Sequence, residues 1–308
     1  MELGVIFKGG RHNARGFIVV AVLWILATLS ALVLIYLTYV TNTAAIVAGS
    51  TDRVQTEALV TAAVELTAYR LTGAGERDRP THGTFNAKVG VARLSVMFRS
   101  EAARVDLNSA PKGLLVGLIG GLGATPSDAE SYADRIIAWR TSTKSPADDP
   151  ENSFYRALGL TYVPRHAPFP EIEELWLVQG IPSTFIERML PFVTVFSNLA
   201  SISILDAAPE VVAALPGMTP ERLQAVLTER EKPGVDPKSI AGLSGTGETG
   251  LMASRAYRLS VGVEFGGGRQ TGAEVIILLL DDGDEPYRVL SWRNGVDGGA
   301  GPQRAALR

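Results

Sequence analysis

Residues 15–40 read RGFIVVAVLWILATLSALVLIYLTYV, and this stretch decides how the rest of the chain is placed. From Phe17 to Val40 there is no charged side chain, and the next one is Asp52. A helix over these 24 residues is about 36 Å long, which is enough to cross a bilayer. Lys8, Arg11 and Arg15 precede it, so the positive-inside rule predicts a cytoplasmic N-terminus with the remaining chain across the membrane.

The main alternative for this stretch is a cleaved secretory signal. The apolar part of such a signal is normally about 7 to 15 residues long and is followed by a small-x-small cleavage site. The apolar run here is longer. We therefore expect a single-pass anchor in the cell inner membrane, with the C-terminal domain in the periplasm.

The helical pattern continues beyond the membrane segment to about Leu71, before Gly73. Apolar residues recur there every three or four positions, at Val54, Ala58, Ala62, Leu66 and Tyr69. Such a stripe has to pack against something, which a simple membrane anchor would not require.

Composition excludes several classes of protein. The 308 residues carry 29 Lys+Arg against 32 Asp+Glu, so no global positive field recruits nucleic acid. There is no cysteine, and the three histidines, His12, His82 and His166, are far apart in the sequence, which excludes disulfides, zinc clusters and thiol catalysis. No G-x-S-x-G elbow or phosphate-binding loop occurs. We expect a protein that is not an enzyme and has no catalytic residues.

The pattern beyond the long helix of residues 17–71 predicts an α+β fold. Residues 80–105 hold the first strands, in which Leu94, Val96 and Phe98 alternate with Ser95 and Met97. We expect Ala102–Leu107 to be extended too. The last strands occupy 255–293, and a loose Gly-rich tail follows at 294–308. Between the two β regions lies a helical insertion, with a first part at 106–200 and a second part at 201–254.

The insertion contains a weak internal repeat. Asp106–Pro111 with the following Gly120 and Gly121 parallels Leu205–Pro209 with Gly217. In each copy we expect a polar cap and a proline to begin one helix, and a Thr-Pro pair (Thr125-Pro126, Thr219-Pro220) to begin the next. A looser third copy covers 177–182. This pattern is typical of helix-hairpin-helix or SAM-like domains.

Helix-hairpin-helix modules often bind DNA phosphates through backbone N–H groups and nearby cations. Residues 101–200, however, hold eight Lys+Arg and twelve Asp+Glu, a net charge of −4. This charge opposes phosphate binding, so we favour a packing module over nucleic-acid binding. A membrane-tethered periplasmic DNA-binding module is the second hypothesis for function.

The junction Arg15-Gly16-Phe17 resembles the N-terminus of type IV pilins and pseudopilins. This resemblance implies a leader of residues 1–16, cleavage after Gly16 by a prepilin peptidase, and methylation of the new amino group of Phe17. The fifth mature residue of most family members is Glu, which pairs with the amino terminus of a neighbouring subunit. Ala21 occupies that position here, so the assembly carboxylate is missing.

Further stretches make the chain similar to the general secretion pathway protein K family of the type II secretion system. They lie at residues 15–17, 104–111, 133–140, 167–169, 174–178, 191–197, 214–217 and 287–293. The resemblance implies a pilin-like α/β core with a large helical insertion, and a K-type subunit is expected to lack the Glu at the position of Ala21.

The resemblance also implies a place and partners. The chain would cap the pseudopilus tip with the I and J minor pseudopilins, start assembly and support export of folded proteins across the outer membrane. Other pseudopilins, the prepilin peptidase and the inner-membrane assembly platform are the further partners expected. An insertion of this size would clash with subunits stacked above it in a packed fibre, which independently favours a terminal position.

The loop 145–153 is the one candidate metal site. Asp148, Asp149 and Glu151 are hard oxygen ligands of the kind that Ca²⁺ takes in flexible loops. The resemblance implies calcium binding near an acidic loop after the Trp-Arg stretch, although 141–144 here reads TSTK, where acidic residues are often found. A solvated acidic loop is the alternative, and no cofactor is required. The acidic cluster at 281–285 is expected to be a surface turn.

Overall fold

The structure is a computed structural model that describes residues 14–75, 79–145, 148–232, 234, 236–245, 251, 253–281 and 285–295. Within the first helix it describes the side chains of residues 19–39 and 53–72. The chain divides between Ala58 and Leu59 into two compact units. The predicted tail at 294–308 falls almost entirely outside the described residues.

Helix α1 (Ala14–Thr72) has 59 residues and contributes to both units. In the first unit its apolar side chains are exposed, as Trp24 and Ile35 illustrate. Gly73 directly follows the helix, and its N–H donates to the carbonyl oxygen of Tyr69 at 3.0 Å. The predicted end of the helix is therefore confirmed to within one residue.

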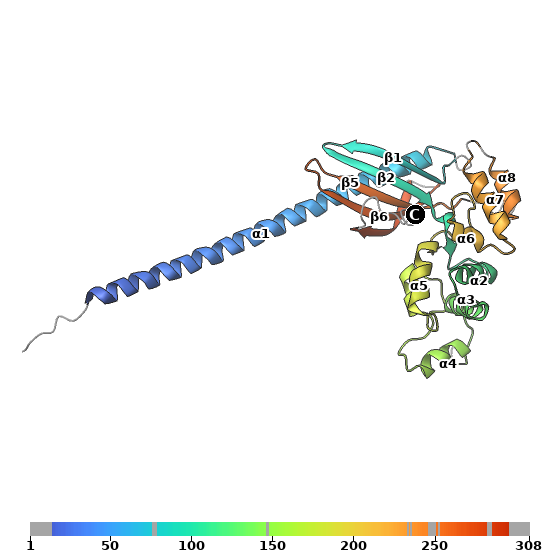
Figure 1. The fold of residues 1–308 in the computed structure, drawn as a ribbon, viewed down its shortest axis with the longest axis horizontal. Coiled ribbons are helices and arrows are strands. Elements are labelled where there is room, and N and C mark those ends of the chain that lie inside the picture. Colours follow the sequence, from blue (N-terminus) through green and yellow to red (C-terminus); the bar gives the residue numbers. More distant parts are fainter. Residues whose placement is uncertain are drawn as a thin grey trace, which may run out of the picture. The chain divides into compact units, whose positions relative to one another are not determined.

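The second unit contains a five-stranded antiparallel sheet (Figure 1). Its strands are β1 (His82–Val89), β2 (Ala92–Ser100), β5 (Ala256–Glu264), β6 (Gln270–Leu279) and β7 (Tyr287–Asn294), in the spatial order β1-β2-β5-β6-β7. The alternation predicted for β2 is confirmed, because Leu94, Val96 and Phe98 are buried. The turn between β5 and β6 is closed by the N–H of Phe265, which donates to the carbonyl of Arg269.

The last turns of α1, from Leu59 on, pack on the inner face of this sheet. The residues buried there are Leu59, Val60, Ala63, Val64, Thr67, Ala68 and Leu71. The predicted stripe was therefore wrong: Val54 and Tyr69 are 67% and 76% exposed. The buried face is displaced by about one position because this part of α1 is apolar on two adjacent faces, and the sheet covers the one that carries Val60, Val64 and Leu71.

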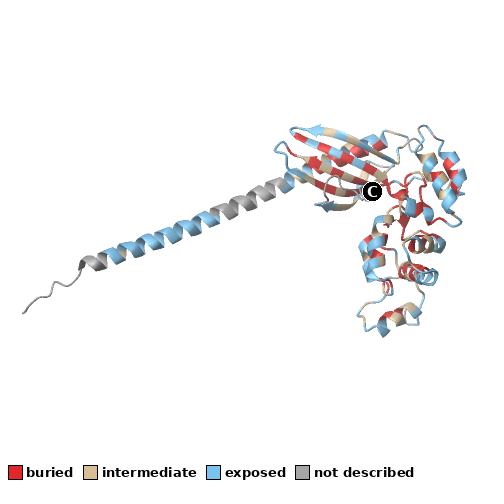
Figure 2. Cartoon of the chain, viewed as in Figure 1, coloured by how far each residue is buried: buried red, intermediate tan, exposed pale blue. Residues whose placement is uncertain are grey.

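All described helices other than α1 lie between β2 and β5 in the sequence. They are η1 (Glu101–Ala103), α2 (Lys112–Gly121), α3 (Pro126–Arg140), α4 (Pro150–Ala157), η2 (Ile172–Leu177), α5 (Ser183–Met189), η3 (Leu190–Phe192), α6 (Pro209–Ala213), α7 (Pro220–Arg230) and α8 (Pro237–Ser244). They share a second hydrophobic core, seen as buried segments in Figure 2. The mixed helix and sheet class is thus confirmed.

Two short strands, β3 (Val105–Asp106) and β4 (Val193–Thr194), pair in parallel within the helical region. The extended segment predicted for Ala102–Leu107 was too long, since Glu101–Ala103 form a 3-10 turn and only Val105 and Asp106 pair. The Ser100 side chain caps that turn by accepting from the N–H of Ala102, which redirects the chain out of the sheet.

The helix starts in the repeats are confirmed for the second helix of each pair. The Thr125 hydroxyl accepts from the N–H of Asp128, and Thr219 does the same for Arg222. The expected polar caps of the first helices were wrong: Pro111 and Ala208 occupy those positions without a side-chain cap. The Asp106 carboxylate instead accepts from the N–H groups of Asn108 and Ser109, forming a turn before the helix.

Helices α2 and α6 approach each other closely at Gly117. A Cβ atom placed there would lie 2.1 Å from the carbonyl oxygen of Ala214, a distance that no real side chain tolerates. Gly120, one turn further along α2, has no atom within 4 Å of such a Cβ. The glycine at 117 therefore permits the contact between the two helices.

We predict that Gly117→Ala lowers the free energy of unfolding by about 1–3 kcal/mol, because α2 and α6 must move apart. Gly120→Ala serves as the matched control and should be neutral or stabilising by up to about 1 kcal/mol, since Ala favours the helix. Denaturant unfolding of the full chain in detergent, followed by circular dichroism, measures both. Equal stability of the two variants would contradict the close contact.

Candidate membrane segment and assembly sites

Within the described residues, one helix is long and apolar enough to cross a membrane. The segment Val19–Tyr39 of α1 has 21 residues and a mean hydropathy of 2.6, and none of it is buried against other parts of the chain. Its length as a helix is about 32 Å, close to the thickness of a bilayer core. A soluble core helix would be largely buried, so this segment has the properties of a single-pass anchor.

The predicted processing positions lie at the start of the same helix. Gly16 and Phe17 have helical backbone, whereas residues 1–13 of the predicted leader lie outside the described residues. Ala21 lies within the apolar segment, and residues 19–39 contain no Asp, Glu, Lys or Arg. This part of the helix accordingly has no carboxylate with which to pair the amino group of a neighbouring chain.

The acidic loop does not gather the predicted calcium ligands. Asp149 is the N-cap of α4, where its Oδ1 accepts from the N–H groups of Glu151 and Asn152. Glu151 pairs with Arg135 at 2.8 Å, and Asp148 is exposed. The described residues contain no group of three or more acidic or histidine side chains that could hold a metal ion.

These contacts explain why the three residues do not fit calcium in this arrangement. A calcium site brings several oxygens around one point. Here the helix N-terminus and an arginine already neutralise two of the three carboxylates. The pKa of Asp149 lies below its usual value, because its hydrogen bonds from backbone N–H groups and from the Thr143 side chain outweigh the raising effect of burial.

The cations of the helical region are largely engaged within it. Lys112 pairs with Asp134, Arg135 with Glu151 and Arg165 with Glu174. Arg140 donates to two backbone carbonyls, those of Leu107 and Ala110. This use of the basic side chains, added to the negative charge of the region, disfavours a phosphate-binding surface on the hairpins.

A buried ionic cluster lies where the chain leaves the sheet after β2, and no pattern along the sequence indicates it. The Glu101 carboxylate accepts from Arg258 on β5, with Nε at 2.8 Å and Nη2 at 3.2 Å, and from the hydroxyl of Thr194 on β4. Arg258 also donates to Glu274 on β6. Glu101 and Thr194 are 1% and 0% exposed. The cluster thus joins three strands of two sheets to one turn.

At the same place, serine hydroxyls connect the segment where the chain leaves the sheet to the segment where it returns. The Ser100 hydroxyl contacts both the N–H and the carbonyl of Ser254, which is 154 positions later. The Ser254 hydroxyl in turn donates to the carbonyl of Ser197. The helical region is consequently fastened to the sheet at both of its ends.

Electrostatics in the cluster favour the charged forms of the paired groups. Burial alone would raise the pKa of Glu101, but Arg258, with help from Arg104 and Thr194, holds it below the usual 4.5. Burial alone would lower the pKa of Arg258, but Glu101 and Glu274 raise it. Burial and the nearby charge of Arg258 lower the pKa of Arg104 to about 10.

Comparison with known proteins adds a family to this geometry. Residues 93–198 match the family model described as type II secretion system (T2SS), protein K. This region is therefore similar to protein K of the type II secretion system. It begins within β2, includes Glu101 and Thr194 of the buried cluster, and ends after β4.

Solved structures agree with a protein K fold. The chain is similar to one from the crystal structure of the GspK-GspI-GspJ complex of the enterotoxigenic Escherichia coli type 2 secretion system, with a TM-score of 0.59 and 16% identity. The similarity covers 80% of this chain and 98% of that one. No curated protein matches the sequence. The likeness to this solved structure shows that the two chains share a fold.

We predict that Glu101→Gln destabilises the full chain by about 3–5 kcal/mol at pH 7, because it leaves Arg258 with one carboxylate fewer in a buried place. Unfolding in denaturant measures this loss. Glu264→Gln removes the exposed pair with Arg93 and is the matched control, with an expected loss of about 1 kcal/mol or less.

The pH dependence of this loss has a definite sign. Since the folded-state pKa of Glu101 is lowered, its contribution is fully present above the unfolded value of about 4.5 and is lost as the pH falls through the folded value. The stability difference between the natural chain and Glu101→Gln should therefore shrink below about pH 4.5. A difference that stays constant down to pH 3 would contradict the ionised pair.

Proposed function

We propose that this chain is a minor pseudopilin that caps the pseudopilus tip of a type II secretion system. The observation that carries the proposal is the protein K region, positioned between two adjacent strands of a sheet whose inner face is covered by the end of the apolar N-terminal helix. The protein acts by assembly and not by catalysis. Its anchor lies in the cell inner membrane and its C-terminal domain in the periplasm.

The position of the helical region supports the tip over the shaft of a fibre. The chain leaves the sheet beside Ser100, forms helices α2 to α8, and returns to the same end of the sheet beside Ser254. Subunits stacked tightly along a fibre would have to accommodate this bulk at every repeat. A terminal subunit has no neighbour on that side. The absence of a carboxylate at Ala21 agrees with a place in which the usual pairing with the next subunit is not made.

The partners follow from the same proposal. The similar crystal structure is of a complex of GspK with GspI and GspJ, so the I and J minor pseudopilins are the expected partners of this chain. The prepilin peptidase would cleave after Gly16 and methylate Phe17. Other pseudopilins and the inner-membrane assembly platform would receive the mature chain, start assembly and support export of folded proteins. No calcium is assigned to this role.

Processing provides the first test. We predict that the chain isolated from membranes begins at a methylated Phe17 in cells that contain the prepilin peptidase, and at Met1 in cells that lack it. Intact-protein mass spectrometry measures both. Gly16→Val should block cleavage while leaving the membrane segment intact. A chain cut after Val40 would instead indicate an ordinary secretory signal, and an uncut chain would indicate a plain anchor.

Assembly provides the second test. We predict that the mature chain copurifies from detergent extracts with the I and J subunits in a fixed ratio, and that crosslinks place it at one end of isolated pseudopili. Its regular occurrence along the shaft would contradict tip capping. Binding of duplex DNA that is salt-dependent and reduced by Lys112→Gln would favour the tethered DNA-binding module, in which the hairpin cations contact phosphates.

A further inference from the structure

The face of the sheet that points away from α1, here called the outer face, is open along β1 and β2. On these strands Phe85, Ala87 and Leu94 pack on the α1 side, so the alternate side chains point outward. The outward residues include Thr84, Asn86, Lys88, Arg93, Ser95 and Met97, all exposed.

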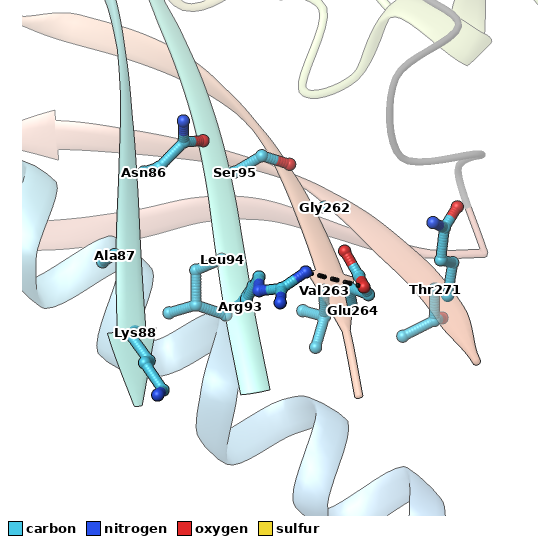
Figure 3. A pocket seen from close by; sticks show the side chains of 11 residues that line it. Asn86, Ala87, Lys88, Arg93, Leu94, Ser95, Gly262, Val263, Glu264 and Thr271 are labelled. Atoms are coloured by element: carbon cyan, nitrogen blue, oxygen red, sulfur yellow. Dashed lines mark hydrogen bonds and ion pairs between the residues drawn. The ribbon is translucent and has the colours of Figure 1, made fainter. Parts of the chain in front are cut away.

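One end of the outer face is hollowed. The hollow has a volume of about 560 Å³, which lies within the range of ordinary ligand sites. Ser95 and Gly262 are the small residues that leave room for it (Figure 3). Asn86 and Lys88 line one side, and Glu264 and Gln270 line the other.

The outer face also carries unpaired positive charge. Arg93 is paired with Glu264, and Arg258 with Glu101 and Glu274. In the part of the chain that the structure describes, Lys88, Arg99 and Arg104 have no hydrogen bond or ion pair through their side chains. The charges of Arg258 and Arg99 act against that of Arg104, while Glu101 and Glu274 favour it. A further carboxylate, Asp206, pairs with His82, the residue opposite Arg99 on β1.

This charge is costly in the isolated chain. Arg104 is partly desolvated and is close to Arg258, and both effects lower its pKa to about 10. A carboxylate of a partner near Arg99 and Arg104 would offset part of the repulsion among these guanidinium groups. The guanidinium groups of Arg99 and Arg104, which have no ion pair among the described residues, therefore favour an anionic partner at this end of the outer face.

The spacing of the cations indicates how large that partner is. Arg93 and Arg99 are six residues apart on β2, which corresponds to about 20 Å along the strand. Lys88 lies opposite Arg93 on β1, at the hollow. A single inorganic ion cannot span from Lys88 to Arg99, whereas about six residues of extended polypeptide can.

We propose that the outer face, from the hollow at Lys88 to Arg99 and Arg104, docks an acidic extended segment of another protein. Carboxylates of the segment pair with Lys88 and Arg99, and one side chain fills the hollow above Ser95 and Gly262. Glu264 and Gln270 accept hydrogen bonds from backbone N–H groups of the segment. The backbone of a polypeptide has N–H groups for Glu264 and Gln270 to accept from, whereas the backbone of a nucleic acid has none, so a polypeptide fits this surface better.

The test uses the full chain in an uncharged detergent and a fluorescein-labelled ten-residue peptide of alternating Glu and Ser, with anisotropy as the readout. We expect Lys88→Gln and Arg99→Gln each to raise the dissociation constant about threefold, and the double variant to raise it about tenfold. Ser95→Trp, which fills the hollow, should also weaken binding. Arg156→Gln on α4, an exposed arginine away from this face, is the matched control and should have no effect.

Several outcomes would overturn the proposal. Equal weakening by Arg156→Gln, or equal binding of a Lys-Ser peptide, would show that the attraction is not specific to this face. Displacement of the peptide by inorganic phosphate at matched charge would show that the surface binds small anions and not a polypeptide segment. Tighter binding of a single-stranded oligonucleotide, with the same dependence on Lys88 and Arg99, would replace the acidic protein segment with a nucleic acid.

Discussion

The pairing of β2 with β5 is the constraint on which the rest of this fold depends. The two strands are neighbours throughout Arg93–Ser100 and Tyr257–Glu264, yet the whole helical region separates them in the sequence. The chain must therefore leave the sheet after Ser100, at the end of β2, and return beside that same end before β5 begins at Ala256. This requirement explains why Ser100, Glu101 and Ser254, at the point of departure and return, are buried and hydrogen-bonded to one another or to Arg258.

The buried ions at this point supply specificity more than stability. Taking Glu101 and Arg258 out of water costs several kcal/mol, which their attraction offsets only when every lone pair and N–H is satisfied. The hydroxyl of Thr194 and the second carboxylate, Glu274, complete that set. Because Thr194 belongs to β4 in the helical region, the set is complete only when the helical region and the sheet are correctly joined. A mispaired arrangement would leave a charge buried without a partner.

Sequence reasoning succeeded where the determinant is local. Alternation at Leu94, Val96 and Phe98 and the hydroxyl caps at Thr125 and Thr219 are short-range signals, and the structure confirms them. It failed where distant segments decide. Which face of α1 is buried depends on the sheet that covers it, so the stripe through Tyr69 was misplaced. The Glu101–Arg258 pair joins residues 157 positions apart, and no pattern along the chain indicates it.

The two faces of the sheet differ in what covers them. The inner face is apolar, is covered by the last turns of α1, and cannot meet a partner without unfolding. The outer face is divided, because the cluster around Glu101 attaches the helical region at one end while the hollow at Lys88 stays open at the other. The guanidinium groups of Arg99 and Arg104, which have no ion pair among the described residues, lie at the boundary between these parts. A partner held there would contact the sheet beside the point where the helical region is fastened, so its binding would add to the stability of that junction.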